Sequence, residues 1–158
     1  MIRVRTMTPE DWPAVEVIYA EGIATRQATF ETETPTWAAF DAGRMREHRL
    51  VAVDESRVVG WAALSPTSTR DCYSGVAEHS VYVSTEARGK GVGRVLMEAL
   101  LRSADGGGIW TIQTSVFPEN NASIALHERV GFRAVGRRER IAQLDGQWRD
   151  TILFERRV

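Results

Sequence analysis

The 158-residue sequence lacks the features that mark exported, membrane-bound and nucleic-acid-binding proteins. Its one cysteine, Cys72, cannot form an internal disulfide, and its first residues contain no apolar stretch that could serve as an export signal or a membrane span. Lysine and arginine number 20 against 21 acidic residues, so the basic surplus that attracts nucleic acids and anionic membranes is also missing. We therefore expect a cytoplasmic protein with a small-molecule partner and with no nucleic-acid or membrane partner.

Long polar tracts, internal repeats and low-complexity segments are absent as well. Hydrophobic residues make up 43% of the chain, which is enough for a buried core at this length. No stretch has the composition of a linker between domains. We expect a single domain over residues 1–158.

The spacing of hydrophobic residues predicts alternating strands and helices. Strands are expected at 2–5, 50–53, 58–64, 76–83, 110–116, 132–144 and 147–155. Helices are expected from about 9 to 24, from 35 or 36 to about 48, from a glycine-rich turn near residue 90 to 104, and from about 122 to 130. The order β-α-α-β-β-β-α-β-α-β-β predicts an α/β (α+β) fold, in which a mixed central sheet has helices packed on its faces.

Three connections in this order carry specific expectations. The segment from strand 76–83 through a helix to strand 110–116 is a βαβ crossover, which implies that the two strands run parallel. Asp145-Gly146 lies between the last two strands and is typical of a two-residue hairpin turn. The polar stretch 25–34 is expected to form a loop.

The glycine-rich turn consists mainly of glycine and basic residues. Its members are Arg88, Gly89, Lys90, Gly91, Val92, Gly93 and Arg94. Glycines let successive backbone N–H groups converge on one point, and the free amides and the dipole of a helix N-terminus attract phosphate. The turn therefore indicates a pyrophosphate site, although a tight turn with solvated basic residues would show the same pattern.

The neighbouring residues argue against two common phosphate-binding loops. A nucleoside-triphosphate loop needs lysine and then serine or threonine after its last glycine, but Val92 follows Gly91 and Arg94 follows Gly93. The dinucleotide fingerprint needs a third glycine where this chain has Arg94 or Leu96. Neither ATP hydrolysis nor a nicotinamide cofactor is expected.

Two spaced motifs resemble those of the GNAT N-acyltransferase superfamily. The superfamily's acetyl-CoA-binding motif is similar to the pattern Arg88-x-x-Gly91-x-Gly93 that follows Val81-Tyr82-Val83. Its next motif is similar to Asn120-x-x-Ser123-x-x-Leu126-His127-x-x-x-Gly131-Phe132. Because the order of elements also matches, the resemblance covers essentially the whole chain and implies a GNAT-like fold with acetyl-CoA as co-substrate.

Four segments resemble the phosphinothricin and methionine-sulfoximine acetyltransferases of that superfamily: 28–31, 77–83, 126–128 and 145–150. This resemblance implies a homodimeric enzyme that transfers an acetyl group from acetyl-CoA to the amine of a small amino acid or amino-acid analogue, by direct attack in a ternary complex. An acceptor amine on a protein N-terminus or on an antibiotic stays open, as does a non-catalytic acyl-CoA-binding module.

The same resemblance assigns cofactor-binding residues in three groups. They are Val81, Tyr82 and Val83 for the pantetheine arm, the turn from Arg88 to Arg94 for the pyrophosphate, and Asn120 and Ser123 for the rest of the cofactor arm. The splayed strands of the superfamily would leave a slot for the thioester. No metal is expected.

Glu78 corresponds by resemblance to the superfamily's general base, which takes the proton of the amine directly or through water. A backbone N–H, that of Val83 or a neighbour, would stabilise the thioester oxygen as it gains charge. Many superfamily members have a tyrosine proton donor where this chain has His127, so His127 stays open between proton donor, substrate contact and structural residue. His79 is expected to be a packing residue or a member of a polar network. No obvious base lies beside Cys72 in the sequence, which argues against an acyl-cysteine intermediate.

The carboxylate of an amino-acid acceptor requires a cation near the slot. Arg70 is the nearest candidate in the sequence, and it shares the loop before the Glu78 strand with Tyr73. Phe30 and Glu31 lie in the loop after the first helix, a region that the superfamily uses around its acceptor pocket. We therefore expect Phe30, Glu31, Arg70 and Tyr73 to bind the substrate, although a surface arginine and core aromatic residues would give the same pattern.

Overall fold

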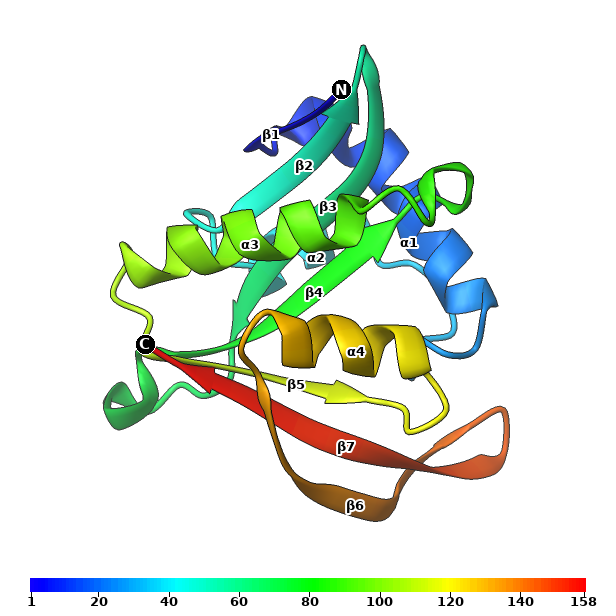
Figure 1. The fold of residues 1–158 in the computed structure, drawn as a ribbon, viewed down its shortest axis with the longest axis vertical. Helices are drawn as coiled ribbons and strands as arrows, with labels where there is room; N and C mark the ends of the chain where they lie inside the picture. Colours follow the sequence, from blue (N-terminus) through cyan, green and yellow to red (C-terminus); the bar gives the residue numbers. More distant parts are fainter.

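The computed structural model describes all 158 residues, which form a seven-stranded mixed sheet with helices on both faces (Figure 1). The strands lie in the spatial order β1-β2-β3-β4-β5-β7-β6. Their bounds are β1 (Ile2–Thr6), β2 (Arg49–Asp54), β3 (Arg57–Pro66), β4 (Val76–Val83), β5 (Thr111–Val116), β6 (Arg133–Leu144) and β7 (Gln147–Arg157). The helices are α1 (Trp12–Ala24), α2 (Trp37–Gly43), α3 (Val92–Asp105) and α4 (Asn121–Arg129). The predicted order of elements and the predicted fold class are confirmed.

Side-chain alternation along the central strands divides the core between the two faces of the sheet. In β3, Trp61 and Ala63 point toward the face covered by α1 and α2, whereas Ala62 and Leu64 point toward α3. All four are fully buried, which is why this strand reads as a continuous apolar run. Leu96 of α3 is also fully buried and belongs to the same cluster as Ala62 and Leu64. The sheet is thus covered on both sides.

Helix α2 is shorter than the predicted helix from 35 or 36 to about 48. It ends at Gly43, and Arg44 is extended with φ −118° and ψ 143°. The buried Arg49 side chain explains this end, because its guanidinium donates hydrogen bonds to the carbonyl oxygens of Asp41, Arg44 and Met45 at 2.8, 2.7 and 3.2 Å. Carbonyls capped by a side chain need no further helical turn. Residues 44–48 therefore connect α2 to β2 outside the helix.

The other connections agree with the sequence. The parallel pairing of β4 and β5 is confirmed, as is the β6–β7 hairpin. Asp145 and Gly146 have φ values of 51° and 78°, so both central residues of the hairpin turn are left-handed, as a type I′ turn requires. The first helical region begins with a 3₁₀ turn over Pro9–Asp11 before α1. None of the helices combines the length and the apolar composition needed to cross a membrane.

Candidate active site

The sheet opens between β4 and β5. These parallel strands pair only from Val76–Thr111 to Glu78–Gln113, whereas β5 stays paired with β7 as far as Val116. Past Glu78 the two strands diverge, and a cleft of about 560 Å³ occupies the region of the split. The slot expected between splayed strands is therefore present, and Glu78 lies at the point where it begins.

The β4 edge that faces this cleft carries main-chain groups without a strand partner. Ser84 N–H donates to the Val59 carbonyl of β3 at 2.8 Å, and main-chain groups alternate between the two sides of a strand. The N–H groups of Val81 and Val83 therefore point away from β3, into the split. Buried or half-buried amides of this kind need an acceptor. They can bind an extended amide chain or the oxygen of a polarised carbonyl.

The glycine-rich turn has the main-chain geometry of an anion cradle. Gly89 and Gly91 both have φ 79°, and a Cβ added at either would meet no atom within 4 Å, so the space beside them is open. None of the N–H groups from Gly89 to Arg94 donates a hydrogen bond within the protein, and the first helical bond runs from Val95 N–H to the Gly91 carbonyl. Free amides at a helix N-terminus suit a phosphate. The turn therefore fits the diphosphate of a coenzyme A ester.

Only one residue of this turn, Gly93, lines the cleft itself. A Cβ at Gly93 would lie 3.6 Å from the side chains of both Val83 and Leu126, so the turn adjoins β4 and α4 at one end of the cleft. The basic residues of the turn are exposed, and Arg94 pairs with Glu98 at 2.7 Å. The structure thus brings the turn and the Val81–Val83 edge together, as predicted.

The pKa of Glu78 is raised, because surrounding protein desolvates its carboxylate. The positive charge of Arg44 opposes this rise. The side chain is nevertheless exposed to the solvent of the cleft, so a substrate can reach it. A carboxylate with a raised pKa, open to a cleft, has the properties of a general base.

His79 and His127 form a buried pair on the opposite face of β4. Their rings stack with centroids 5.0 Å apart, and the two Nε2 atoms are 2.9 Å apart. His127 Nδ1 lies 2.6 Å from the Ser123 carbonyl oxygen, which can only accept, so Nδ1 carries a proton. Burial lowers the pKa of both rings, that of His79 to about 3, so both are neutral. His79 Nε2–H then donates to His127 Nε2, and His127 has no proton at Nε2 to give.

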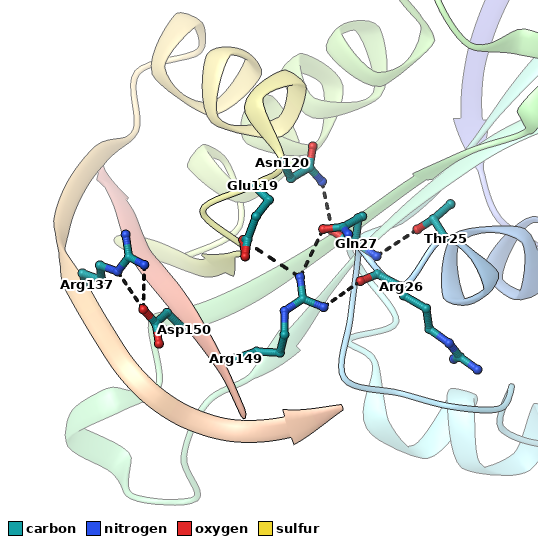
Figure 2. Close-up of polar contacts among 8 residues, drawn as sticks. All are labelled: Thr25, Arg26, Gln27, Glu119, Asn120, Arg137, Arg149 and Asp150. Carbon is teal, nitrogen blue, oxygen red and sulfur yellow. Dashed lines mark hydrogen bonds and ion pairs between the residues drawn. The ribbon is translucent and has the colours of Figure 1, made fainter. Parts of the chain in front are cut away.

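Asn120 and Ser123 line the cleft, but the carboxamide of Asn120 is used within the protein. Its Oδ1 caps α4 by accepting from Ser123 N–H at 3.1 Å. Its Nδ2 donates to the Gln27 carbonyl at 3.0 Å, as Figure 2 shows. Asn120 therefore joins the start of α4 to the loop after α1. This contact supports a positioning role more than the cofactor contact that the resemblance implied.

Arg149 of β7 holds the same loop from the other side, a contact that the sequence did not reveal. Figure 2 shows its guanidinium between the loop and α4, donating to the Arg26 carbonyl at 3.0 Å and to Gln27 Oε1 at 3.1 Å. It also lies 4.0 Å above the Phe117 ring. The loop it holds carries Phe30, which lines the cleft and packs edge-on against Phe117 at 5.0 Å. The one signal in the sequence was the position of Arg149 inside the segment 145–150.

The predicted substrate residues divide into two groups. Phe30 and Glu31 line the cleft, as expected. Arg70 and Tyr73 do not, because they lie at the exposed 3₁₀ turn Asp71–Tyr73, where the guanidinium is 5.7 Å from the phenol ring. The cation that lines the cleft in their place is Arg44. It was missed because residue 44 falls inside the segment that was expected to be helical.

Comparison with known proteins gives the class to which this fold and site belong. The model of the acetyltransferase (GNAT) family matches residues 7–132. The chain therefore belongs to the GNAT acetyltransferase family. The predicted family, fold class and acetyl-CoA co-substrate are confirmed.

Individual relatives cover nearly the whole chain. It is 34% identical to the L-methionine sulfoximine/L-methionine sulfone acetyltransferase of Pseudomonas paraeruginosa, over 96% of this chain and 92% of the relative. It is 32% identical to the phosphinothricin N-acetyltransferase of Alcaligenes faecalis, over 97% and 81%. A crystal structure of a GNAT superfamily phosphinothricin acetyltransferase from Sinorhizobium meliloti, in complex with acetyl-CoA, matches with a TM-score of 0.88 at 29% identity, over 99% of this chain and 88% of that one.

Proposed function

We propose that the protein transfers the acetyl group of acetyl-CoA to the α-amine of a small amino acid or amino-acid analogue of the methionine sulfoximine or phosphinothricin type. The observation that carries the proposal is the position of Glu78 at the start of the split, beside the unpaired N–H groups of Val81 and Val83. A base and an oxyanion site are thereby next to one another in one cleft. The names of the relatives at 34% and 32% identity support the acceptor class.

In this proposal the co-substrate binds along β4 and the turn. The free amides from Gly89 to Arg94 hold the diphosphate, and the edge from Val81 to Val83 pairs with the pantetheine arm. The thioester carbonyl then points at an N–H donor of this edge, that of Val83 or Val81. A donor preorganised at a developing negative charge contributes about 2.7–4 kcal/mol to the barrier reduction in comparable sites.

Glu78 removes the proton that the amine loses on attack, directly or through water. The α-amine of a free amino acid has a pKa above the value of about 7.7–8.0 for a chain N-terminus, because its own carboxylate favours the protonated form, so most of it is protonated at pH 7 and a base assists the attack. The new C–N bond forms and the C–S bond breaks, while the amine proton passes to Glu78. The leaving thiolate of coenzyme A takes a proton from solvent. His127 is a structural residue in this scheme, because its Nδ1–H and Nε2 are both engaged inside the protein.

We also propose a cytoplasmic homodimer of single-domain subunits. β6 is an edge strand, and it exposes Val135 and Ile141 at 45% and 41% of their surface. Trp148 of β7 is exposed at 51% in the same hairpin. Exposed apolar side chains on an open strand edge favour pairing with a second chain. Sedimentation of the purified protein, with charged substitutions at Val135 and Ile141 as the comparison, tests this part.

A thiol-release assay with a panel of amines tests the proposed activity. The panel contains methionine sulfoximine, methionine sulfone, phosphinothricin, the free amino acids, peptides with free N-termini and aminoglycosides. We expect turnover with the first three, and silence on every free amino acid and analogue would refute the proposal. Activity confined to peptides or aminoglycosides would replace the acceptor class, and tight coenzyme A binding without any thiol release would indicate a non-catalytic module.

A further inference from the structure

Arg44 is a cation in the cleft wall without an acidic partner. It follows α2 in a segment that contains two other arginines. Arg49 is buried and pairs with Asp41 at 2.6 Å, and the exposed Arg46 lies 3.6 Å from the same carboxylate. Arg44 forms none of the ion pairs of the protein, and its Nε is buried without a hydrogen-bond partner. Buried donors nearly always have partners, so the missing one is expected to come from a ligand.

The surroundings of Arg44 fix its position. Its carbonyl oxygen accepts from the Arg49 guanidinium at 2.7 Å, and its own guanidinium lies 4.9 Å from the centre of the Phe40 ring. A buried neighbour therefore holds the backbone, and an aromatic ring in the core supports the side chain. Such an arginine loses little conformational entropy when it binds a planar anion.

The charge of Arg44 acts on the acceptor side of the cleft. Arg44, Tyr19, Glu78 and Tyr82 all line the cleft. Burial raises the pKa of Tyr19, Glu78 and Tyr82, and the nearby positive charge of Arg44 opposes each of these rises. Glu78 and Tyr82 share one face of β4 by their even spacing, whereas Val83 packs toward Gly93 on the other face. The cation thus lies on the side of the proposed base and away from the diphosphate turn.

We infer that Arg44 binds the α-carboxylate of the acceptor, so that the cleft selects amino acids that carry a free carboxylate beside the reacting amine. This inference rests on the proposed function and names the group that distinguishes its substrates. The α-amine of a bound amino acid would face Glu78 while its carboxylate, two bonds away, pairs with the guanidinium. A bidentate pair of this kind is both strong and directional. A peptide N-terminus has no α-carboxylate at this position and would leave Arg44 unpaired.

The test compares methionine sulfone with its α-carboxamide, which differs only in the charge of the carboxyl group. We expect the wild-type enzyme to prefer the acid by about 10–100-fold in kcat/KM, after correction for the fraction of neutral amine, because a hydrogen-bonded charge of this kind contributes that much. Arg44→Met should bring the ratio close to one, and Arg44→Lys should restore part of it. The matched control is Arg46→Met, which removes a neighbouring exposed arginine and should leave the ratio unchanged.

A second measurement needs no turnover. Calorimetric binding of N-acetyl-methionine sulfone to the coenzyme A complex should be about 10–100-fold weaker for Arg44→Met than for Arg46→Met, with melting temperatures reported for both. Equal binding in the two variants, or an unchanged acid preference in Arg44→Met, would overturn the inference even if acetyl transfer occurs. If no amine on the panel is acetylated, the proposed function fails, and the binding experiment still decides the role of Arg44.

Discussion

Replacing Glu78 with glutamine should abolish the base while leaving the shape of the cleft intact. General-base catalysis typically contributes about 10²–10⁴-fold, which corresponds to roughly 2.7–5.5 kcal/mol of the barrier. We therefore expect kcat to fall by about this factor with methionine sulfone as acceptor. The dissociation constant of coenzyme A should stay nearly unchanged, because Glu78 lies where the β4–β5 pairing ends, whereas the glycine-rich turn adjoins Val83 at the far end of β4. Glu128→Gln, which changes an exposed carboxylate on α4, is the matched control.

The pH dependence sharpens this prediction. Desolvation raises the pKa of Glu78 above the ordinary value for glutamate. The ionised carboxylate that acts as the base therefore forms only when the pH rises through this higher pKa. Below that value the wild-type reaction needs two deprotonations, one of Glu78 and one of the amine, and log kcat/KM should rise with a slope of about two. Glu78→Gln should show a slope of about one throughout. If Glu78→Gln kept the slope of about two, Glu78 would not be the general base. The same conclusion would follow if the variant lost coenzyme A binding and kept its turnover.

Stability gives an independent check of the same pKa shift. A carboxyl group whose pKa is raised by folding destabilises the folded state as the pH rises from the unfolded-state pKa to the folded-state pKa. Glu78→Gln should therefore melt at or above the wild-type temperature at pH 7. The difference should vanish below about pH 4, where glutamate is protonated in both states. A lower melting temperature at pH 7 would mean that the carboxylate makes a stabilising contact.

Three further predictions concern the rest of the site. Gly91→Trp should abolish coenzyme A binding in calorimetry, because the indole fills the space beside the free amides. Gly108→Trp is the control, since it places the same side chain on left-handed backbone in a remote turn. It should lose about 1–2 kcal/mol of stability and keep its affinity for coenzyme A. Arg149→Met should raise the KM for the acceptor about tenfold while coenzyme A binding changes little, because its hydrogen bonds hold the loop after α1, which carries Phe30. Arg149→Lys should recover part of the loss. Nitrogen NMR should show neutral rings between pH 6 and 8, protonated at Nδ1 in His127 and at Nε2 in His79, and a titration of His127 in this range would contradict its structural role.

Local chemistry explains why most of the elements could be predicted. The Asp145-Gly146 turn requires left-handed backbone, which these residues adopt easily, and it was placed correctly. The crossover into β5 has one favoured hand, so its parallel pairing followed from the order of elements. The predicted end of α2 differs from the observed one because a buried side chain six residues beyond Gly43, that of Arg49, caps the helix through tertiary contacts. A pattern of hydrophobic spacing does not contain that information.

Part of the candidate site could likewise be predicted from the sequence, and part of it could not. The glycine-rich turn, Glu78 and the β4 edge are close in sequence, and main-chain geometry alone brings them to one cleft. Arg70 is predicted to bind the acceptor carboxylate only because it is the cation nearest to Glu78 in the sequence. In the structure it lies outside the cleft. Arg44 reaches the same cleft on the Glu78 side of β4, from the end of α2. Only the packing of α2 against the sheet decides which cation lies near the base.

The sequence by itself determined the order of elements, the anion-binding turn and the family, because each depends on residues that interact over short stretches of chain. The tertiary structure decided the rest: the point where β4 leaves β5, the neutral His79–His127 pair and the cation at the acceptor end. These features join residues that are tens of positions apart, and burial, which sets their protonation and their partners, exists only in the folded chain.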